Sequence, residues 1–152
     1  MSILRISLEI VERLVVTRLT GLSGIQFFER GRNDPITDDG ISSDPWCRLL
    51  HVDVEDKVRN TSSVAYGTVT GIVGLAVPGD LIVADAFTLA RCLDQLAEVL
   101  SYGREVDSPE THDLTFIGCK RVEDIEPVIS EAADRWVATG GVMFEANVCC
   151  TA

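Results

Sequence analysis

Basic residues are few in this sequence. The 152 residues include 13 lysines and arginines against 24 aspartates and glutamates, which gives a net charge of −11. Proteins that bind along a nucleic-acid backbone neutralise several phosphates with Lys or Arg side chains, so this charge balance argues against a protein that grips DNA or RNA. Copies of the chain that carry the same negative charge also repel one another, which keeps them in solution. A surface past which DNA slides without sticking would need this sign of charge.

Histidine, the commonest general acid or base, is also scarce. Only His51, on the expected polar face of a strand, and His112, in an expected loop beside Asp113, are present. Cys47 and His51 are expected on one strand face, but four residues of a strand span about 13 Å, too far for a thiol and an imidazole to hydrogen-bond. We therefore predict no catalytic residue and a protein that is not an enzyme.

The cysteines lack the spacing of a metal or redox site. They are five, an odd number, without a C-x-x-C pair, and they lie in apolar or strand-like runs, as is typical of buried, reduced thiols. Two of them are adjacent, so their side chains point to opposite faces of a strand and one is a candidate for a subunit contact. The five are Cys47, Cys92, Cys119, Cys149 and Cys150.

Phosphate-binding and metal-binding signatures are missing as well. The glycines at 21–24 and 140–141 lack the surrounding pattern of a P-loop or of a dinucleotide-binding turn. The acidic run Asn33 to Gly40 offers oxygen ligands of the kind hard cations take, but its spacing does not match a twelve-residue calcium loop, and a solvated loop is the expected reading. We predict no cofactor and no metal.

Long apolar runs and targeting signals do not occur. No run approaches the roughly 20 apolar residues that span a bilayer, and the N-terminus lacks the basic region, apolar block and cleavage site of a signal peptide. We expect no membrane contact and synthesis in the cytoplasm. Because 46% of the residues are apolar, the chain can bury a core as a single domain over residues 1–152.

Apolar periodicity predicts two helices. In the first, Ile3 to Leu19, apolar residues recur at helical spacing, Ser2 caps the start and Gly21 ends it. The second begins at Ala84 or Asp85, with Asp85 as its N-cap and Gly103 at its end. Charged residues of the first helix fall on its polar side: Arg5, Glu9, Glu12, Arg13 and Arg18. The buried stripe of the second is Phe87, Ala90, Leu93, Leu96, Ala97 and Leu100.

Five strands are predicted, with polar loops between them. The strand Cys47 to Val58 alternates, with Leu50, Val52, Val54 and Val58 on its apolar face. This order predicts an α+β fold: a mainly antiparallel sheet of about four to five strands, two helices packed on one face, and an extended β hairpin or edge. The other strands are Gly24 to Arg30, Val64 to Val77, Leu114 to Val122 and Arg135 to Cys149; the loops and connection are Gly31 to Trp46, Arg104 to Asp113, and Glu123 to Asp134 with Pro127.

The strand Val64 to Val77 is unusually long and nearly uncharged. Uncharged exposed edges recruit partners, so this segment is either buried in the sheet or forms an edge that adds to a neighbouring subunit. Trp46 and Trp136 each begin a strand, where an aromatic closes the core or joins an interface. The candidate subunit-interface residues are Tyr66, Val69, Ile72, Leu75 and Trp136.

From Ile3 to Cys149 the chain resembles the tail terminator (tail completion) proteins of tailed bacteriophages, of the minor tail protein U type. The likeness is carried by the N-terminal helix closing on Leu19-Thr20-Gly21-Leu22 and the strand Ile25-Gln26-Phe27-Phe28. The strand from Leu49 to Val54, the helix Phe87 to Leu100 and the final strand from Arg135 complete it. It rests on element order, length and a weak terminal pattern rather than on an invariant motif.

The resemblance implies a virion protein without catalysis or cofactor. Such subunits form a homo-oligomeric ring, a hexamer, that caps the tail tube, ends its polymerisation and meets the neck or head-closure protein at the head-tail junction. Tail tube and sheath proteins would be its partners, with DNA as passing cargo through an acidic lumen. Alternatives are another neck component (a head-closure or head-tail adaptor subunit), a small hydrolase, or a small-molecule binding module.

Overall fold

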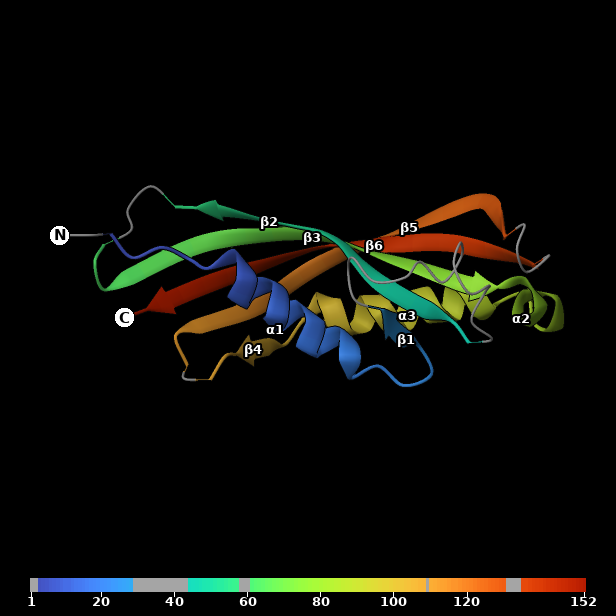
Figure 1. The fold of residues 1–152 in the computed structure, drawn as a ribbon, viewed down its shortest axis with the longest axis horizontal. Helices are drawn as coiled ribbons and strands as arrows, with labels where there is room; N and C mark the ends of the chain where they lie inside the picture. Colours follow the sequence, from blue (N-terminus) through green and yellow to red (C-terminus); the bar gives the residue numbers. More distant parts are fainter. Residues whose placement is uncertain (1–2, 29–43, 58–60, 109, 131–134) are drawn as a thin grey trace.

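The computed structural model describes residues 3–28, 44–57, 61–108, 110–130 and 135–152. Within these ranges the chain forms an α+β fold in which helices lie along one face of a long sheet (Figure 1). The elements in chain order are α1 (Leu8–Thr20), β1 (Gln26–Phe28), β2 (Trp46–Asp56), β3 (Val64–Pro78), α2 (Gly79–Ala84), α3 (Thr88–Ser101), β4 (Arg104–Val106), β5 (His112–Ser130) and β6 (Arg135–Thr151).

The described strands form one mixed, strongly curled sheet with the order β1-β2-β3-β6-β5-β4. Only β1 and β2 pair in parallel, and the other neighbours are antiparallel. The α+β class and the mainly antiparallel pairing are confirmed, but the sheet has six strands instead of four to five. The extra strand is β4, which lies in the predicted loop Arg104 to Asp113.

The long strand β3 lies inside the sheet, so burial, one of its two predicted alternatives, is confirmed and a place at an edge is wrong. It pairs with β2 on one side and with β6 on the other, where the register runs from Val64 opposite Thr151 to Pro78 opposite Val137. The final strand, β6, therefore pairs with the backbone N–H and C=O groups of β3 that would be exposed if β3 were an edge strand. The outermost described strands, β1 and β4, are three residues each, and they pair only with residues 46–48 of β2 and 113–115 of β5.

Helix α1 begins five residues later than predicted. Ser7 is the N-cap, and its hydroxyl accepts a hydrogen bond from the Ile10 N–H at 3.3 Å. Residues 3–6 are not helical, and the Leu4 N–H donates to the Thr61 carbonyl at 2.9 Å. The predicted cap Ser2 lies outside the described residues. Gly21 ends the helix with a right-handed φ of −80°, so its left-handed freedom is not used.

The second predicted helix is divided in two. The short helix α2 comes first, Asp85 lies between the helices, and α3 begins only at Thr88. The Asp85 carboxylate accepts from the Phe87 N–H at 3.0 Å. Phe87, predicted in the buried stripe, is 73% exposed, because it precedes the helix instead of belonging to its inner face. Gly103 does follow α3, with a φ of +105°.

Two strands depart from regular alternation. In β2 a bulge between Leu49 and His51 leaves Leu50 without a register partner, so Leu50 is exposed and not on the apolar face with Val52. In β5 the backbone continues to Ser130, through the predicted connection Glu123 to Asp134, with a register shift between Asp124 and Val128. The rest of that connection, residues 131–134, lies outside the described residues.

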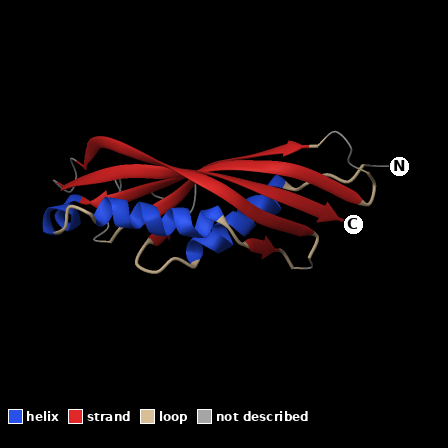
Figure 2. Cartoon of the chain, turned by 180° about the vertical axis from the view of Figure 1, so that it is seen from behind, coloured by secondary structure: helices blue, strands red, loops and turns tan. Residues whose placement is uncertain are grey.

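The main core lies between the sheet and helices α1 and α3, which pack on the same face, as predicted (Figure 2). The Phe116 and Phe144 rings meet at its centre with centroids 5.7 Å apart. Side chains of α1, α3, β2, β3, β5 and β6 are buried there, including Val11, Val15 and Leu19 of α1, Leu93, Leu96 and Leu100 of α3, Val69 and Val73 of β3, and Val142 and Val148 of β6.

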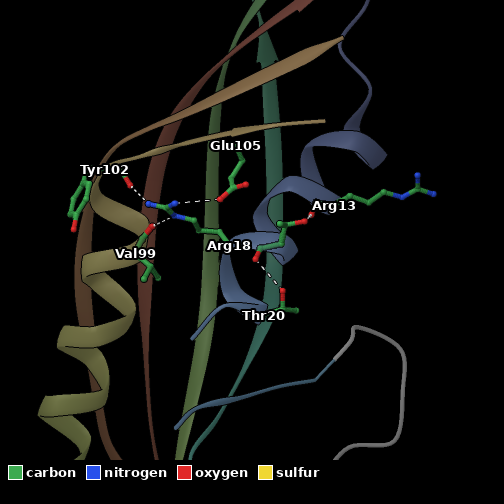
Figure 3. Close-up of polar contacts among 7 residues, drawn as sticks. Arg13, Arg18, Thr20, Val99, Tyr102 and Glu105 are labelled. Atoms are coloured by element: carbon green, nitrogen blue, oxygen red, sulfur yellow. Dashed lines mark hydrogen bonds and ion pairs between the residues drawn. The ribbon is translucent and has the colours of Figure 1, made fainter. Parts of the chain in front are cut away.

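Arg18 joins α1 to the end of α3 (Figure 3). Its Nε donates to the Val99 carbonyl at 2.9 Å and its Nη2 to the Tyr102 carbonyl at 2.8 Å, while Nη1 lies 3.3 Å from a Glu105 carboxylate oxygen of β4. The last carbonyls of a helix lack partners within the helix. Arg18 supplies donors for two carbonyls at this end and so fixes α1, α3 and β4 together.

Candidate functional site

The face of the sheet opposite the helices presents an ordered set of cross-strand rows. Because side chains alternate between faces, the register identifies which residues share this helix-free face. One row runs His51, Ile72, Met143, Lys120 across β2, β3, β6 and β5. The next two rows are Arg48, Gly74, Gly141, Val122 on one side and Asp53, Thr70, Glu145, Gly118 on the other.

Paired glycines hollow this face. Gly74 and Gly141 are register partners, and the floor between their neighbours therefore carries no side chain. The Leu50 side chain fills part of the space above Gly74, where an added Cβ would come within 3.0 Å of its Cδ1. The result is a groove of about 490 Å³, lined mainly by apolar residues that include Trp46, Leu50, Ile72, Val122 and Met143. We call this hollow the apolar groove.

Side chains around the apolar groove are open to solvent. Leu50 is 54% exposed and Met143 48% exposed, and Val122 is exposed as well. A second hollow of about 580 Å³ adjoins it across Ile72 and Met143 and includes His51, Lys120 and Glu145. Apolar surface with a polar rim of this kind is typical of a protein-protein contact.

Trp46 forms the end wall of the apolar groove. Its ring packs edge-on against Phe28 with centroids 5.7 Å apart, in a small cluster with Ala76 and Val137. The indole is buried, yet its Nε1–H has no hydrogen-bond partner in the described part of the chain. A buried donor without an acceptor is costly. The core-closing role predicted for Trp46 is confirmed in this second cluster.

The predicted interface residues are distributed over different environments. Ile72 lies at the centre of the helix-free face and lines both hollows. Tyr66 is exposed at a more distant position of β3, and Trp136 is half-buried with its indole against Gly79 of α2. Val69 and Leu75 are buried in the core between sheet and helices, and Leu75 also borders the apolar groove.

The Cys47 and His51 side chains lie on opposite faces of β2, so the predicted shared face is wrong. The bulge after Leu49 reverses the alternation between them. Cys47 is in the main core, where burial raises the pKa of its thiol to about 12, whereas His51 is exposed on the helix-free face. The pair has no geometry for nucleophilic catalysis.

His112 is the first residue of β5, so its predicted place in a loop is wrong. It is buried, with 4% of its surface exposed, and its Nε2 accepts a hydrogen bond from the Ser7 N–H at 3.0 Å. Its Nδ1 is 2.9 Å from the Thr111 hydroxyl, which donates to Asp107 Oδ2 at 2.7 Å. Both ring nitrogens are thus engaged in joining the N-terminal segment to β5.

The described residues contain no cluster of three or more His, Cys, Asp or Glu side chains that could hold a metal ion. The acidic run Asn33 to Gly40, predicted as a solvated loop, lies outside them. Among the described helices none is long and apolar enough to cross a membrane.

Two comparisons with known proteins found no match. Neither the models of known protein families nor the curated proteins matched this chain.

The residues that form the apolar groove were mostly missed by sequence reasoning. Of its lining residues, Ile72 and Leu75 are predicted at a contact surface, Leu50 is predicted on the apolar face of its strand, and Met143 and Val122 are not singled out. The register between β3 and β6 carries the missing information, because it brings Gly74 opposite Gly141 across 67 residues of sequence. The glycines themselves were the available signal, since glycine in a strand often marks a close approach.

Proposed function

We propose that this protein is a structural virion subunit of a tailed bacteriophage: a tail terminator that forms a ring at the end of the tail tube, stops its polymerisation and joins the tail to the neck. The observation that carries the proposal is the helix-free sheet face. There Leu50, Val122 and Met143 are exposed around the apolar groove, which is surface suited to a subunit contact.

The build of the sheet supports a role as an assembly subunit. The two central strands, β3 and β6, have 15 and 17 residues and pair along their whole length. Typical strands have about five or six residues, so this sheet is a long plate held by continuous backbone pairing. Such a plate presents its face in a fixed shape, which lowers the ordering cost of binding.

The charge of the chain supports a place around passing DNA. A net charge of −11 repels phosphates and leaves little for a nucleic acid to bind. The element order also supports the proposal, since an N-terminal helix, a short strand, long antiparallel strands and a helix before the last strands recur in the family that the sequence resembles.

The proposal is tested by mass in solution and by a tube-capping assay. Light scattering and negative-stain electron microscopy of the purified protein should show a six-membered ring. Added to polymerising tail tube subunits of the phage that encodes it, the protein should cap tubes that otherwise grow to uncontrolled lengths. An unrelated acidic protein of similar size is the control. A protein that stays monomeric, leaves tube length unchanged and is absent from purified virions would contradict the proposal.

A further inference from the structure

The segment before α1 is attached to the sheet at points far apart in the sequence. Residues 3–7 form neither helix nor strand, and Figure 1 shows them as the thin coil that leads from the N-terminal end into α1. The Leu4 N–H donates to the Thr61 carbonyl at 2.9 Å, just before β3, and the Ser7 N–H donates to Nε2 of His112 at 3.0 Å, at the start of β5. We call residues 3–7 the strap.

Ile6 attaches the strap to the main core. Its side chain packs against the buried cluster between sheet and helices. It also lies so close to Gly67 of β3 that a Cβ added there would come within 2.6 Å of Ile6 Cδ1. Val148, the register partner of Gly67 in β6, borders the same point at 3.4 Å from that Cβ. The strap therefore lies over the end of the core where β3 pairs with β6, and its release would uncover apolar surface there.

The hydrogen bonds on both sides of the His112 imidazole require its neutral form with the hydrogen on Nδ1. The Thr111 hydroxyl donates to Asp107 Oδ2 at 2.7 Å, so its oxygen can accept from the Nδ1–H, 2.9 Å away. In that tautomer Nε2 has a lone pair for the Ser7 N–H. A proton added to Nε2 would point at the Ser7 N–H, and two donors cannot bond each other. The attached strap is therefore compatible only with the neutral imidazole.

The other contacts of His112 do not depend on the strap. The His112 backbone N–H donates to Asp107 Oδ1 at 2.6 Å, and Asp107 Oδ2 lies 3.9 Å from Nδ1. A carboxylate at this distance favours the charged imidazole. These contacts hold the ring at the start of β5 after protonation, so the bond that breaks is the one to Ser7.

The charged and titratable groups described around His112 keep their charge in mild acid. Asp107 acts on the imidazole from the turn after β4, and hydrogen bonds lower its pKa, so it stays ionised. From β6, the register partner of His112 is Cys150, whose thiol stays neutral because burial raises its pKa. From α1, Arg13 lines a hollow together with Asp107, and Arg5 of the strap is exposed. Both guanidinium groups remain cationic, so among these groups the imidazole is the one that titrates.

We propose that the strap is a pH-sensitive switch: protonation of His112 releases residues 3–7 from the sheet as a unit, while the rest of the described fold stays intact. The Leu4 bond and the Ile6 contact are then lost together with the Ser7 bond, because the three lie on one short irregular segment. This inference does not depend on the proposed ring function.

The strength of the switch follows from proton linkage. With the strap released, Nε2 is open to water and takes up a proton near pH 6.5, the ordinary value for histidine. With the strap attached, the ring must stay neutral. The equilibrium for release therefore hardly changes between pH 8 and 7, and below pH 6.5 it rises about 10-fold for each pH unit.

Amide hydrogen exchange of the full chain, followed by mass spectrometry at pH 7.5, 6.5 and 5.5, measures this release. Local opening sets the exchange rate of a hydrogen-bonded amide once the intrinsic rate at each pH is divided out. The Leu4 and Ser7 amides should exchange about 10-fold faster at pH 5.5 than at pH 7.5. Leu4 is the informative one, since it bonds Thr61 and not His112. A peptide of α3 that covers residues 93–100 should stay protected.

Two pairs of variants separate the switch from a general effect of acid. His112→Gln keeps a side-chain acceptor but does not titrate, so its Leu4 amide should change less than about 2-fold, whereas His51→Gln on the helix-free face should respond like the wild type. Ser7→Pro removes the N–H at a φ of −83° that proline adopts, and should leave Leu4 unprotected at every pH. Ser7→Ala loses only the hydroxyl cap and should keep the pH response.

Several results would overturn the switch. Wild-type Leu4 could keep the same protection at all three pH values, or the α3 peptide could lose protection together with it, which would mean that the whole fold opens. A His112→Gln chain that still loses Leu4 protection at pH 5.5 would also contradict it. Should His112→Gln be unprotected already at pH 7.5, the Ser7 pair decides, because the same pH response in Ser7→Pro and Ser7→Ala would show that the Ser7 N–H does not hold the strap.

Discussion

The Ser7 backbone N–H donates a hydrogen bond to Nε2 of His112, 105 residues later in the chain, at 3.0 Å. An Nε2 that accepts carries no proton, so the neutral imidazole has its hydrogen on Nδ1, facing the Thr111 hydroxyl. Burial lowers the pKa of His112 below its usual value, and the nearby Asp107 carboxylate opposes this shift only in part. Protonation of His112 would place a proton on Nε2, which would then face the Ser7 N–H as a second donor. The hydrogen bond to the N-terminal segment would be lost.

Stability should therefore fall in mildly acidic solution. Because the folded-state pKa of His112 is lower than the unfolded value of about 6.5, the unfolded chain binds the proton first. Its contribution to stability is complete above pH 6.5 and is lost as the pH falls through the folded-state pKa. Urea unfolding at pH 7.5 and 5.5 should show a decrease with a slope of at most about 1.4 kcal/mol per pH unit for this one proton.

Asp107, which contacts His112, also titrates, and its effect on stability must be separated from that of His112. The Asp107 carboxylate is partly buried, which opposes its ionisation, but hydrogen bonds from the His112 backbone N–H and the Thr111 hydroxyl outweigh this effect and lower its pKa. Its contribution is lost only in stronger acid. His112→Gln should flatten the change between pH 7.5 and 5.5, and His51→Gln on the exposed face should keep it. An unchanged pH dependence in His112→Gln would disprove the assignment.

Arg18 should contribute far more to stability than its neighbour Arg13. The Arg18 guanidinium bonds the carbonyls of Val99 and Tyr102 and lies 5.7 Å from the centre of the Phe116 ring. Arg18→Ala leaves those carbonyls without a charged donor, so we expect a loss of about 2–4 kcal/mol in urea unfolding. Arg18→Lys should recover only part, since an ammonium cannot reproduce the planar set of donors.

Arg13 is the matched control on the same helix. It pairs with Glu9 at 2.6 Å, but both side chains are largely exposed, and exposed pairs contribute little. Arg13→Ala should change the free energy of unfolding by less than about 0.5 kcal/mol. Equal losses for Arg18→Ala and Arg13→Ala would show that the contacts in Figure 3 do not hold the helices together.

The periodicity of apolar residues predicts the main helices and strands, but it does not indicate which polar side chains bond residues far away in the sequence. The pattern placed Arg18 on the polar side of the first helix with Arg13, and nothing local separates the two. Their difference arises because the end of α3 packs beside Arg18, a contact between residues 81 positions apart. Helices and strands follow from local spacing, whereas such contacts depend on the assembled fold.

The errors about the surface have a local physical cause. The bulge at Leu50 shifts β2 by one residue, and a one-residue shift moves every later side chain to the other face. The Asp85 turn similarly begins α3 after Phe87 and removes Phe87 from the buried stripe. Both features turn a residue that the sequence places on a buried face outward to solvent.

Gly79 should not tolerate even a methyl group. A Cβ on Gly79 would overlap the Trp136 indole, which packs directly against the first turn of α2. Gly79→Ala should displace that ring and lower the free energy of unfolding by about 1–3 kcal/mol, with a changed tryptophan emission spectrum. Gly118→Ala is the control, since nothing lies within 4 Å of its added Cβ. Identical spectra and stabilities for both variants would contradict this packing.

The Cys47 thiol should be inert in the folded protein and reactive only after unfolding. Burial raises its pKa to about 12, so at pH 8 only about one molecule in ten thousand carries the reactive thiolate. Cys149, half-buried on the helix-free face, is better placed to react. Iodoacetamide labelling followed by peptide mass spectrometry should modify Cys149 and spare Cys47, and Cys149→Ser should remove the fast-labelled site. In denaturant all five cysteines should react, and early labelling of Cys47 without denaturant would mean that the sheet opens where β2 meets β3.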